Sequence, residues 1–189
     1  TLIDKGWNYI CVGDYDGAVA VLTRATKLAP SDSKALNLLG WAYMYKENYD
    51  DALSIYQKVL LLEPGNCLAR NNLGYICFRK GIYGEAIEHL AEVIRLNADR
   101  TATLYAHYYF GLLYLDREMF DDAINFFSKA IELGPNLIEA YYHLGIAYER
   151  KGDEEQAAKV WHQGASRLPN NRWARKCREE LEARSQAKV

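Results

Sequence analysis

The four histidines are the side chains best suited to acid–base or metal chemistry at neutral pH, but their spacing fits no known motif. They are His89, His107, His143 and His162, and none lies in an H-E-x-x-H arrangement. No serine lies in a G-x-S-x-G context, and no phosphate loop ending in Gly-Lys-Ser/Thr is present. The pairs Glu85/Glu88 and Glu179/Glu182 have the spacing of solvated helical faces. The sequence therefore predicts a protein that is not an enzyme and uses no cofactor.

The four cysteines lack the C-x-x-C spacing of a metal site or a redox motif. They are Cys11, Cys67, Cys77 and Cys177. We expect reduced thiols without a metal, which slightly favours a reducing, cytoplasmic compartment. Cys77 follows Gly74 by three residues, as Tyr43 follows Gly40, so we expect Cys77 in the core.

Five glycines recur at a nearly fixed spacing along the chain. They are Gly6, Gly40, Gly74, Gly111 and Gly145, separated by 34, 34, 37 and 34 residues. Twelve residues after each glycine stands an alanine: Ala18, Ala52, Ala86, Ala123 and Ala157. A fixed period of this length is typical of one supersecondary unit that is copied and stacked. Function must then be sought on the repeated surface rather than in one catalytic cluster.

Each unit carries two apolar runs with helical periodicity. In the second unit the runs lie on either side of Asn48, with Leu36, Leu39 and Tyr43 before it and Leu53 and Tyr56 after it. Glycine inside a helix costs about 1 kcal/mol relative to alanine. Five glycines at the same position of the repeat therefore predict close packing between the two helices of each unit.

These residues resemble the tetratricopeptide repeat signature over roughly residues 1 to 171. The resemblance is carried by Leu39-Gly40, Tyr43, Tyr49, Ala52, Tyr56 and Pro64, and by Phe110-Gly111, Tyr114, Phe120, Ala123, Phe127, Ala130 and Pro135. It implies an all-α fold, a right-handed superhelical solenoid of antiparallel helix pairs. About five repeats are expected, at 1–32, 33–66, 67–103, 104–137 and 138–171, in a single array over 1–189.

Two regions depart from the period. Three extra residues lie between the third and fourth units, and we expect an extra helical turn there, capped by Thr101. After the last unit, a capping helix is predicted at about 172–186. Its inner stripe would be Trp173, Cys177 and Leu181, placed against the final repeat.

The composition bounds the partners. The net charge of −2 suggests neither nucleic acid nor an anionic membrane as a partner, and no apolar run is long enough for a membrane span. The chain begins at Thr1 within the first predicted helix, so we expect a trimmed start. A preceding targeting segment or lipid anchor would then not be visible.

The resemblance implies that the first helices of the repeats line a concave groove. At the family's groove positions this chain places an aromatic and apolar stripe with asparagines: Trp7, Asn37, Trp41, Met44, Tyr45, Asn71, Asn72, Tyr75, Phe78, Arg79, Tyr108, Tyr109, Leu112, Tyr142 and His143. Tyr43, Tyr114 and Tyr148 are assigned to packing between helices. Packing and binding both stay open for five aromatic residues: Trp7, Trp41, Tyr45, Tyr75 and Phe78.

The leading hypothesis is a protein-interaction scaffold that holds a peptide or helix of another protein in this groove. A self-assembling scaffold that forms a homo-oligomer is the first alternative. Asp4-Lys5-Gly6 with Gly13, Tyr15, Ala18 and Val19 faintly resembles the first repeat of magnetosome-type scaffolds of this kind. The second alternative is a regulatory module of a larger enzyme, such as the tetratricopeptide-bearing glycosyltransferases.

Overall fold

The computed structural model describes residues 1–187 and places them in eleven α-helices, with no strand among them. The chain divides into two compact units at Val93/Ile94, and each unit is described by itself. The first unit holds α1 (Leu2–Val12), α2 (Tyr15–Leu28), α3 (Ser33–Tyr45), α4 (Tyr49–Leu62), α5 (Cys67–Arg79) and most of α6 (Tyr83–Leu96). The second holds α7 (Arg100–Asp116), α8 (Phe120–Leu133), α9 (Ile138–Lys151), α10 (Glu154–Arg167) and α11 (Arg172–Ala187).

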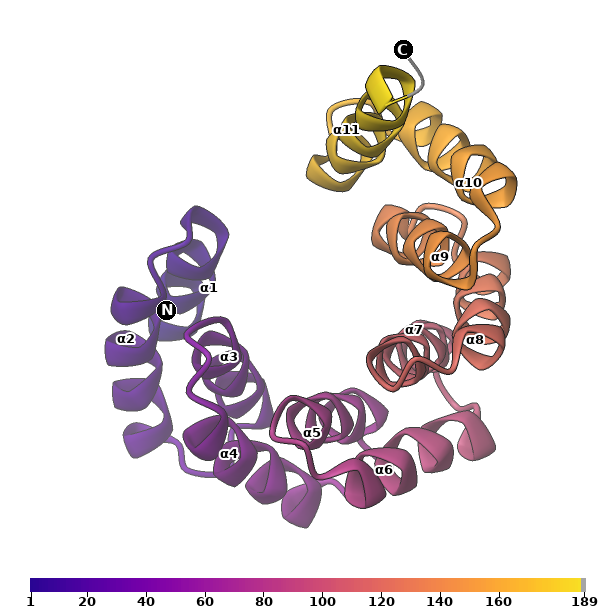
Figure 1. The fold of residues 1–189 in the computed structure, drawn as a ribbon. Coiled ribbons are helices and arrows are strands. Elements are labelled where there is room, and N and C mark those ends of the chain that lie inside the picture. Colours follow the sequence, from indigo (N-terminus) through magenta and orange to yellow (C-terminus); the bar gives the residue numbers. More distant parts are fainter. Residues whose placement is uncertain (188–189) are drawn as a thin grey trace. The chain divides into compact units, whose positions relative to one another are not determined.

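Antiparallel helix pairs build both units. In the first unit, α1, α3 and α5 form one layer, and α2, α4 and α6 form the layer behind it (Figure 1). In the second unit, α7 and α9 alternate with α8 and α10, and α11 packs against α9 and α10. The all-α helical-repeat fold is therefore confirmed. The single array over both units stays a prediction, and residues 188–189 of it lie outside the described residues.

Polar N-caps explain where most of the helices begin. Seven such side chains each accept a hydrogen bond from the backbone N–H three residues ahead: Thr1, Asp14, Asp32, Asn48, Asn66, Asp99 and Asp153. This bond satisfies one of the donors that a helix leaves unpaired at its first turn. The short turn inside each pair contains one residue with positive φ: Gly13, Glu47, Gly81, Glu118 or Gly152.

The repeated glycines are sites of close approach between paired helices. A Cβ at Gly40 would lie 2.8 Å from the Tyr56 ring, and one at Gly111 would lie 2.5 Å from Phe127. The other three glycines meet large side chains in the same way, sixteen residues later on the second helix: Gly6 meets Leu22, Gly74 meets Leu90 and Gly145 meets Trp161. The predicted packing reason for these glycines is confirmed.

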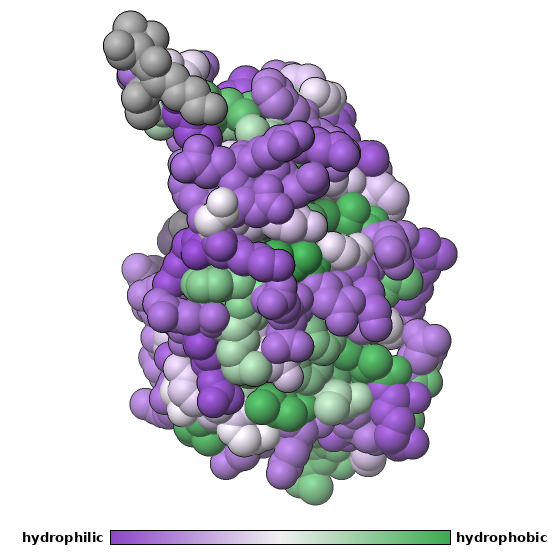
Figure 2. Space-filling view, turned by 45° about the vertical axis from the view of Figure 1, so that its right-hand side comes forward, coloured by the Kyte–Doolittle hydropathy of each residue, from purple (hydrophilic) through white to green (hydrophobic). Residues whose placement is uncertain are grey.

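The cores lie between the two layers of each unit. The alanines that follow the glycines by twelve residues are all fully buried, as are Tyr56, Phe127 and Trp161. On the face drawn in Figure 2, hydrophilic side chains predominate, and apolar side chains appear as smaller patches between them. Among residues 1–187, no helix combines the length and the apolar character needed to cross a bilayer.

The insertion between the third and fourth repeats lengthens α7. This helix has 17 residues, whereas α3 and α5 have 13 each, so the expected extra turn is confirmed. The expected cap is wrong. The helix begins at Arg100, and the Asp99 carboxylate accepts the N–H of Ala102 at 2.7 Å. A carboxylate one residue before the helix caps it as well as a threonine would. Its negative charge also interacts favourably with the positive end of the helix dipole.

Candidate binding surface

Three aromatic side chains form a row on the first helices of the first unit, and we call Trp7, Trp41 and Tyr45 the aromatic row. The ring centroids of Trp7 and Trp41 are 5.7 Å apart, and those of Trp41 and Tyr45 are 5.8 Å apart. Trp7 is 43% exposed and Tyr45 47% exposed, while Trp41 is half-buried between them. Trp7 and Trp41 each follow a repeat glycine, so the glycines that pack the helix pairs also fix where these rings lie. The rings are therefore neighbours on α1 and α3, and their role in binding a partner stays a prediction.

The row is held in place at one end. Tyr45 stacks on Tyr15 with ring centroids 4.9 Å apart and an interplanar angle of 5°. Tyr15 begins α2, so this contact joins the end of α3 to the preceding helix pair. Aromatic pairs of this kind are worth about 0.5–1.5 kcal/mol beyond their buried area. The Tyr45 ring is therefore oriented before any partner arrives.

The predicted residues on α5 form a second aromatic group. The ring centroids of Tyr75 and Phe78 are 6.3 Å apart, and both side chains are half-buried. Arg79 lies over the Tyr75 ring and donates to its hydroxyl at 2.8 Å. The same guanidinium lies 3.2 Å from the carboxylate of Glu47. Arg79 is thus engaged by its own chain, which limits the charge that it offers to a partner.

The asparagines and Met44 contribute less to the surface than expected. Asn37 donates its side-chain N–H to the backbone oxygen of Ser33 at 2.7 Å, its own backbone oxygen accepts the Tyr56 hydroxyl at 3.3 Å, and Asn72 is half-buried. Asn71 is only 2% exposed. Met44 packs partly against the core that contains Tyr56. The sequence pattern could not distinguish amides that serve their own helix from amides that face a partner.

In the second unit, one predicted residue on α7 is part of the core and two pack against it. Tyr108 is 7% exposed, and its hydroxyl lies 3.3 Å from Nδ1 of His143. Tyr109 and Leu112 are half-buried and pack against the same core cluster. Tyr108 was expected at the binding surface. Its burial follows from the contact between α7 and α9, where the ring fills the space beside Phe127.

Trp173 of α11 covers the predicted residues of α9. Its ring lies 5.3 Å from Tyr142 and 5.2 Å from His143, and Lys176 lies over it at 4.5 Å. The capping helix was expected to cover the final repeat, and Cys177 is fully buried in that contact. The pattern did not show that Trp173 would lie against two proposed binding residues.

This packing shifts the acid–base properties of both α9 residues. The pKa of His143 is lowered to about 4, mainly by burial and to a smaller extent by nearby Lys176, while the hydrogen bond to the Glu139 carbonyl acts in the opposite direction. The distance from Nδ1 to that carbonyl oxygen is 2.8 Å. Burial, followed by the charge of Glu180, raises the pKa of Tyr142 to about 12. Both side chains are therefore neutral at pH 7.

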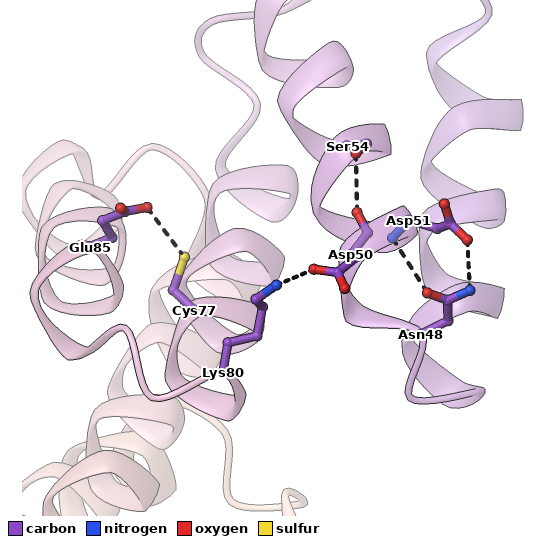
Figure 3. Close-up of polar contacts among 7 residues, drawn as sticks. All are labelled: Asn48, Asp50, Asp51, Ser54, Cys77, Lys80 and Glu85. Carbon is purple, nitrogen blue, oxygen red and sulfur yellow. Dashed lines mark hydrogen bonds and ion pairs between the residues drawn. The ribbon is translucent and has the colours of Figure 1, made fainter.

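Ion pairs join successive helix pairs within each unit. Lys80 reaches Asp50 of the preceding pair, and Lys46 reaches Asp16 in the same manner (Figure 3 shows the first). Lys151 repeats the contact with Asp121 at 2.6 Å in the second unit. Exposed pairs contribute about 0–1 kcal/mol each. Their recurrence at one position supports the register of the stacked pairs.

Three potential metal ligands meet on the α5–α6 pair. The ligand atoms of Cys77, Glu85 and His89 lie within 4.8 Å of one another, although the sequence showed no metal-ligand spacing. All four cysteines are free, and Cys77 is buried as predicted. The signal in the sequence was Glu85 and His89, four residues apart on one helix face, opposite a cysteine on the preceding helix.

Comparison with known proteins agrees with this architecture. Models described as tetratricopeptide repeat or TPR repeat match residues 3–60 and 38–101, residues 111–152 and residues 139–170. A crystal structure of MamA protein is 31% identical and has a TM-score of 0.63, covering 86% of this chain and 87% of that one. PilF of Pseudomonas aeruginosa is 20% identical with a TM-score of 0.76, covering 99% and 86% respectively, which shows the fold alone.

A curated relative matches part of the chain. Photosystem I assembly protein Ycf3 of Acaryochloris marina (strain MBIC 11017) is 26% identical over an alignment 94 residues long, which covers 42% of this chain and 57% of that protein. The match thus spans little more than half of the relative's length. The chain is a helical-repeat scaffold of the type that serves protein–protein interaction. With repeat models matched across both units, the chain belongs to the tetratricopeptide repeat family.

Proposed function

We propose that the aromatic row of the first unit binds a segment of a partner protein through apolar anchor side chains. The observation that carries this proposal is the exposure of Trp7 and Tyr45, at 43% and 47%, beside the half-buried Trp41. Adjacent large aromatic rings left on a surface commonly mark partner sites, and Trp and Tyr dominate binding energy at interfaces.

The row is suited to an extended or helical segment rather than to a single small molecule. Its ring centroids are 5.7 and 5.8 Å apart along α1 and α3, the first helices of two neighbouring pairs. Neighbouring anchor side chains of one bound segment could therefore each contact a ring. Side chains three and four residues apart on a helix have a similar spacing, about 5–6 Å between Cβ atoms. Tyr75 and Phe78 extend the apolar character onto α5.

The second unit contributes less to this proposal. Trp173 lies against Tyr142 and His143, and Tyr108 is buried. Contacts within the chain therefore occupy the rings of three predicted binding residues. The proposed contact set is therefore Trp7, Trp41 and Tyr45, with Tyr75 and Phe78 at its edge. We also propose that the chain acts without catalysis, since binding alone accounts for this surface.

Partner selection from a random peptide library tests the proposal. The full chain is the bait, and the Trp7→Ala/Trp41→Ala variant is the counter-bait. We expect peptides enriched in aromatic or large aliphatic anchors that the variant does not retain. Peptides retained equally by both baits would contradict the proposal. Light-scattering mass over a concentration series addresses the alternative of self-assembly, because a constant monomer mass argues against it.

A further inference from the structure

Cys77, Glu85 and His89 converge at the turn between α5 and α6. The Cys77 Sγ lies 3.8 Å from a carboxylate oxygen of Glu85, and Figure 3 shows the two side chains pointing toward each other. Glu85 and His89 are four residues apart on α6, so both project from one face of that helix. The potential ligand atoms of all three residues lie within 4.8 Å of one another.

We propose that these three residues bind a divalent zinc-class metal ion. Sulfur, imidazole nitrogen and carboxylate oxygen are the three ligand types that Zn²⁺ takes in proteins, at about 2.3, 2.0–2.1 and 2.0–2.2 Å. In a tetrahedral site such bonds place the ligand atoms about 3.5 Å apart. The 3.8 Å between Cys77 and Glu85 is already close to this value, and the other separations, each within 4.8 Å, need to contract by at most about 1.3 Å. Glu85 is exposed and can supply this movement by side-chain rotation.

The three ligands differ in burial: Cys77 is buried, His89 is half-buried and Glu85 is exposed. Burial and the neighbouring Glu85 raise the pKa of the Cys77 thiol to about 11, so the metal ion has to displace a proton that the metal-free chain keeps on sulfur. A bound cation would displace that proton to solvent and form the metal–thiolate bond. Burial and the charge of Arg70 lower the pKa of His89, which keeps the imidazole in its neutral, ligating form.

The charges around the site are nearly balanced. Glu85 and Glu88 act on His89 against Arg70, and Lys80 acts on Cys77. Lys80 forms an ion pair with Asp50 (Figure 3), whereas Arg70 donates to the neutral backbone oxygen of Pro64 at 2.9 Å. A metal ion at the site would therefore meet one carboxylate ligand and one thiolate, with the charge of Lys80 offset by Asp50 and Arg70 as the neighbouring cation.

The metal ion would join the two helices of one repeat. Cys77 lies near the end of α5, and Glu85 lies in the first turn of α6. With three protein ligands, a fourth position remains open to water or an external ligand. The site uses no residue of the aromatic row, so this inference stands apart from the proposed function.

Titration of the reduced, metal-free full chain with Co²⁺ tests the site. We expect a thiolate-to-cobalt charge-transfer band together with visible ligand-field bands, and added Zn²⁺ should remove both. Cys77→Ala should abolish the charge-transfer band. His89→Gln and Glu85→Gln should each weaken the affinity more than about tenfold, since even the outer-shell partners of metal ligands are worth about that much. Cys67→Ala is the matched control, because Cys67 is another buried thiol on α5.

The outcomes separate clearly. Loss of binding in Cys77→Ala and His89→Gln with full binding in Cys67→Ala would support the site. No charge-transfer band in the wild-type chain would overturn it, and so would a band that persists in Cys77→Ala. If Cys77→Ala fails to fold, as judged by circular dichroism, the His89→Gln variant is measured in its place, because His89 is only half-buried. Unchanged Co²⁺ affinity in His89→Gln would then refute the proposal.

Discussion

Glu47 has a left-handed backbone conformation, with φ at 57°, and its carboxylate lies 3.2 Å from the guanidinium of Arg79 in the following helix pair. The second unit repeats this relationship, with Glu118 at φ 60° and 2.7 Å from Arg150. Gly13, Gly81 and Gly152 occupy the equivalent turns of the other pairs. A carboxylate thus replaces glycine in two turns, and in both it reaches the next pair.

Substitution of Glu47 separates backbone strain from the ion pair. Left-handed φ costs a non-glycine residue about 1 kcal/mol, whereas an exposed ion pair contributes about 0–1 kcal/mol. Glu47→Gly should therefore leave the free energy of unfolding unchanged or raise it slightly. Glu47→Ala keeps the strain and loses the pair, so it should be less stable than Glu47→Gly by about 1 kcal/mol. Urea unfolding of the two variants measures the difference, and equal stability would argue against strain at this turn.

Alanine at a repeat glycine should destabilise its helix pair. In Gly40→Ala the new methyl group would lie 2.8 Å from the fully buried Tyr56 ring. Overpacking of this kind costs about 1–3 kcal/mol, which outweighs the roughly 1 kcal/mol gained in helix propensity. Thermal unfolding should show a lower midpoint for this variant and for Gly111→Ala.

Gly84 supplies the control for this prediction. It lies in the first turn of α6, is exposed, and has nothing within 4 Å of an added Cβ. Gly84→Ala should therefore stabilise the chain by about 0.4–1 kcal/mol. Equal effects at Gly40 and Gly84 would show that close packing is not the reason for the repeated glycine.

His143 should make stability depend on pH. Its folded pKa of about 4 lies below its ordinary value of 6.5, so the unfolded chain binds a proton more readily. Stability from this group is complete above about pH 6.5 and is lost as pH falls toward 4, by up to about 3 kcal/mol. Comparison of wild type with His143→Gln over pH 7 to 4 isolates this contribution. Parallel curves would show that His143 is not buried in its neutral form.

Removal of the Trp173 ring should expose the residues that it covers. In Trp173→Ala, water reaches Tyr142 and His143, whose rings now lie 5.3 and 5.2 Å from the indole. The pKa of His143 should then rise toward 6.5, because burial is the main cause of its depression. NMR titration of the histidine ring measures the pKa, and an unchanged value would assign the burial to other contacts.

The sequence predicted the repeat, the helix pairs and the reason for the glycines, because these rest on a local pattern seen five times. It also placed Trp7, Trp41 and Tyr45 on one surface. Each of these predictions depends on the periodicity of single helices and on one recurring contact between them. Such features are local in sequence and therefore visible in it.

The features that the sequence did not predict depend on contacts between different helices. Asp99 rather than Thr101 caps α7, because the exact start of a helix is decided by which side chain reaches its first turn. Tyr142 and His143 fit the binding pattern, but Trp173 from the capping helix lies against them. Likewise, the spacing of Glu85 and His89 places both on one face of α6, but the convergence of Cys77 with them depends on how α5 and α6 face each other.

The most direct test of the aromatic row is a fluorescence-anisotropy titration of a library-selected peptide against three forms of the full chain. The forms are wild type, Trp7→Ala/Trp41→Ala, and Leu61→Ala as an exposed apolar control on α4, where Leu61 is 82% exposed. We predict that the double variant binds about thirtyfold more weakly or worse, while Leu61→Ala binds as wild type does. Equal affinity for the wild type and the double variant, with helicity intact in both, would contradict the proposed function.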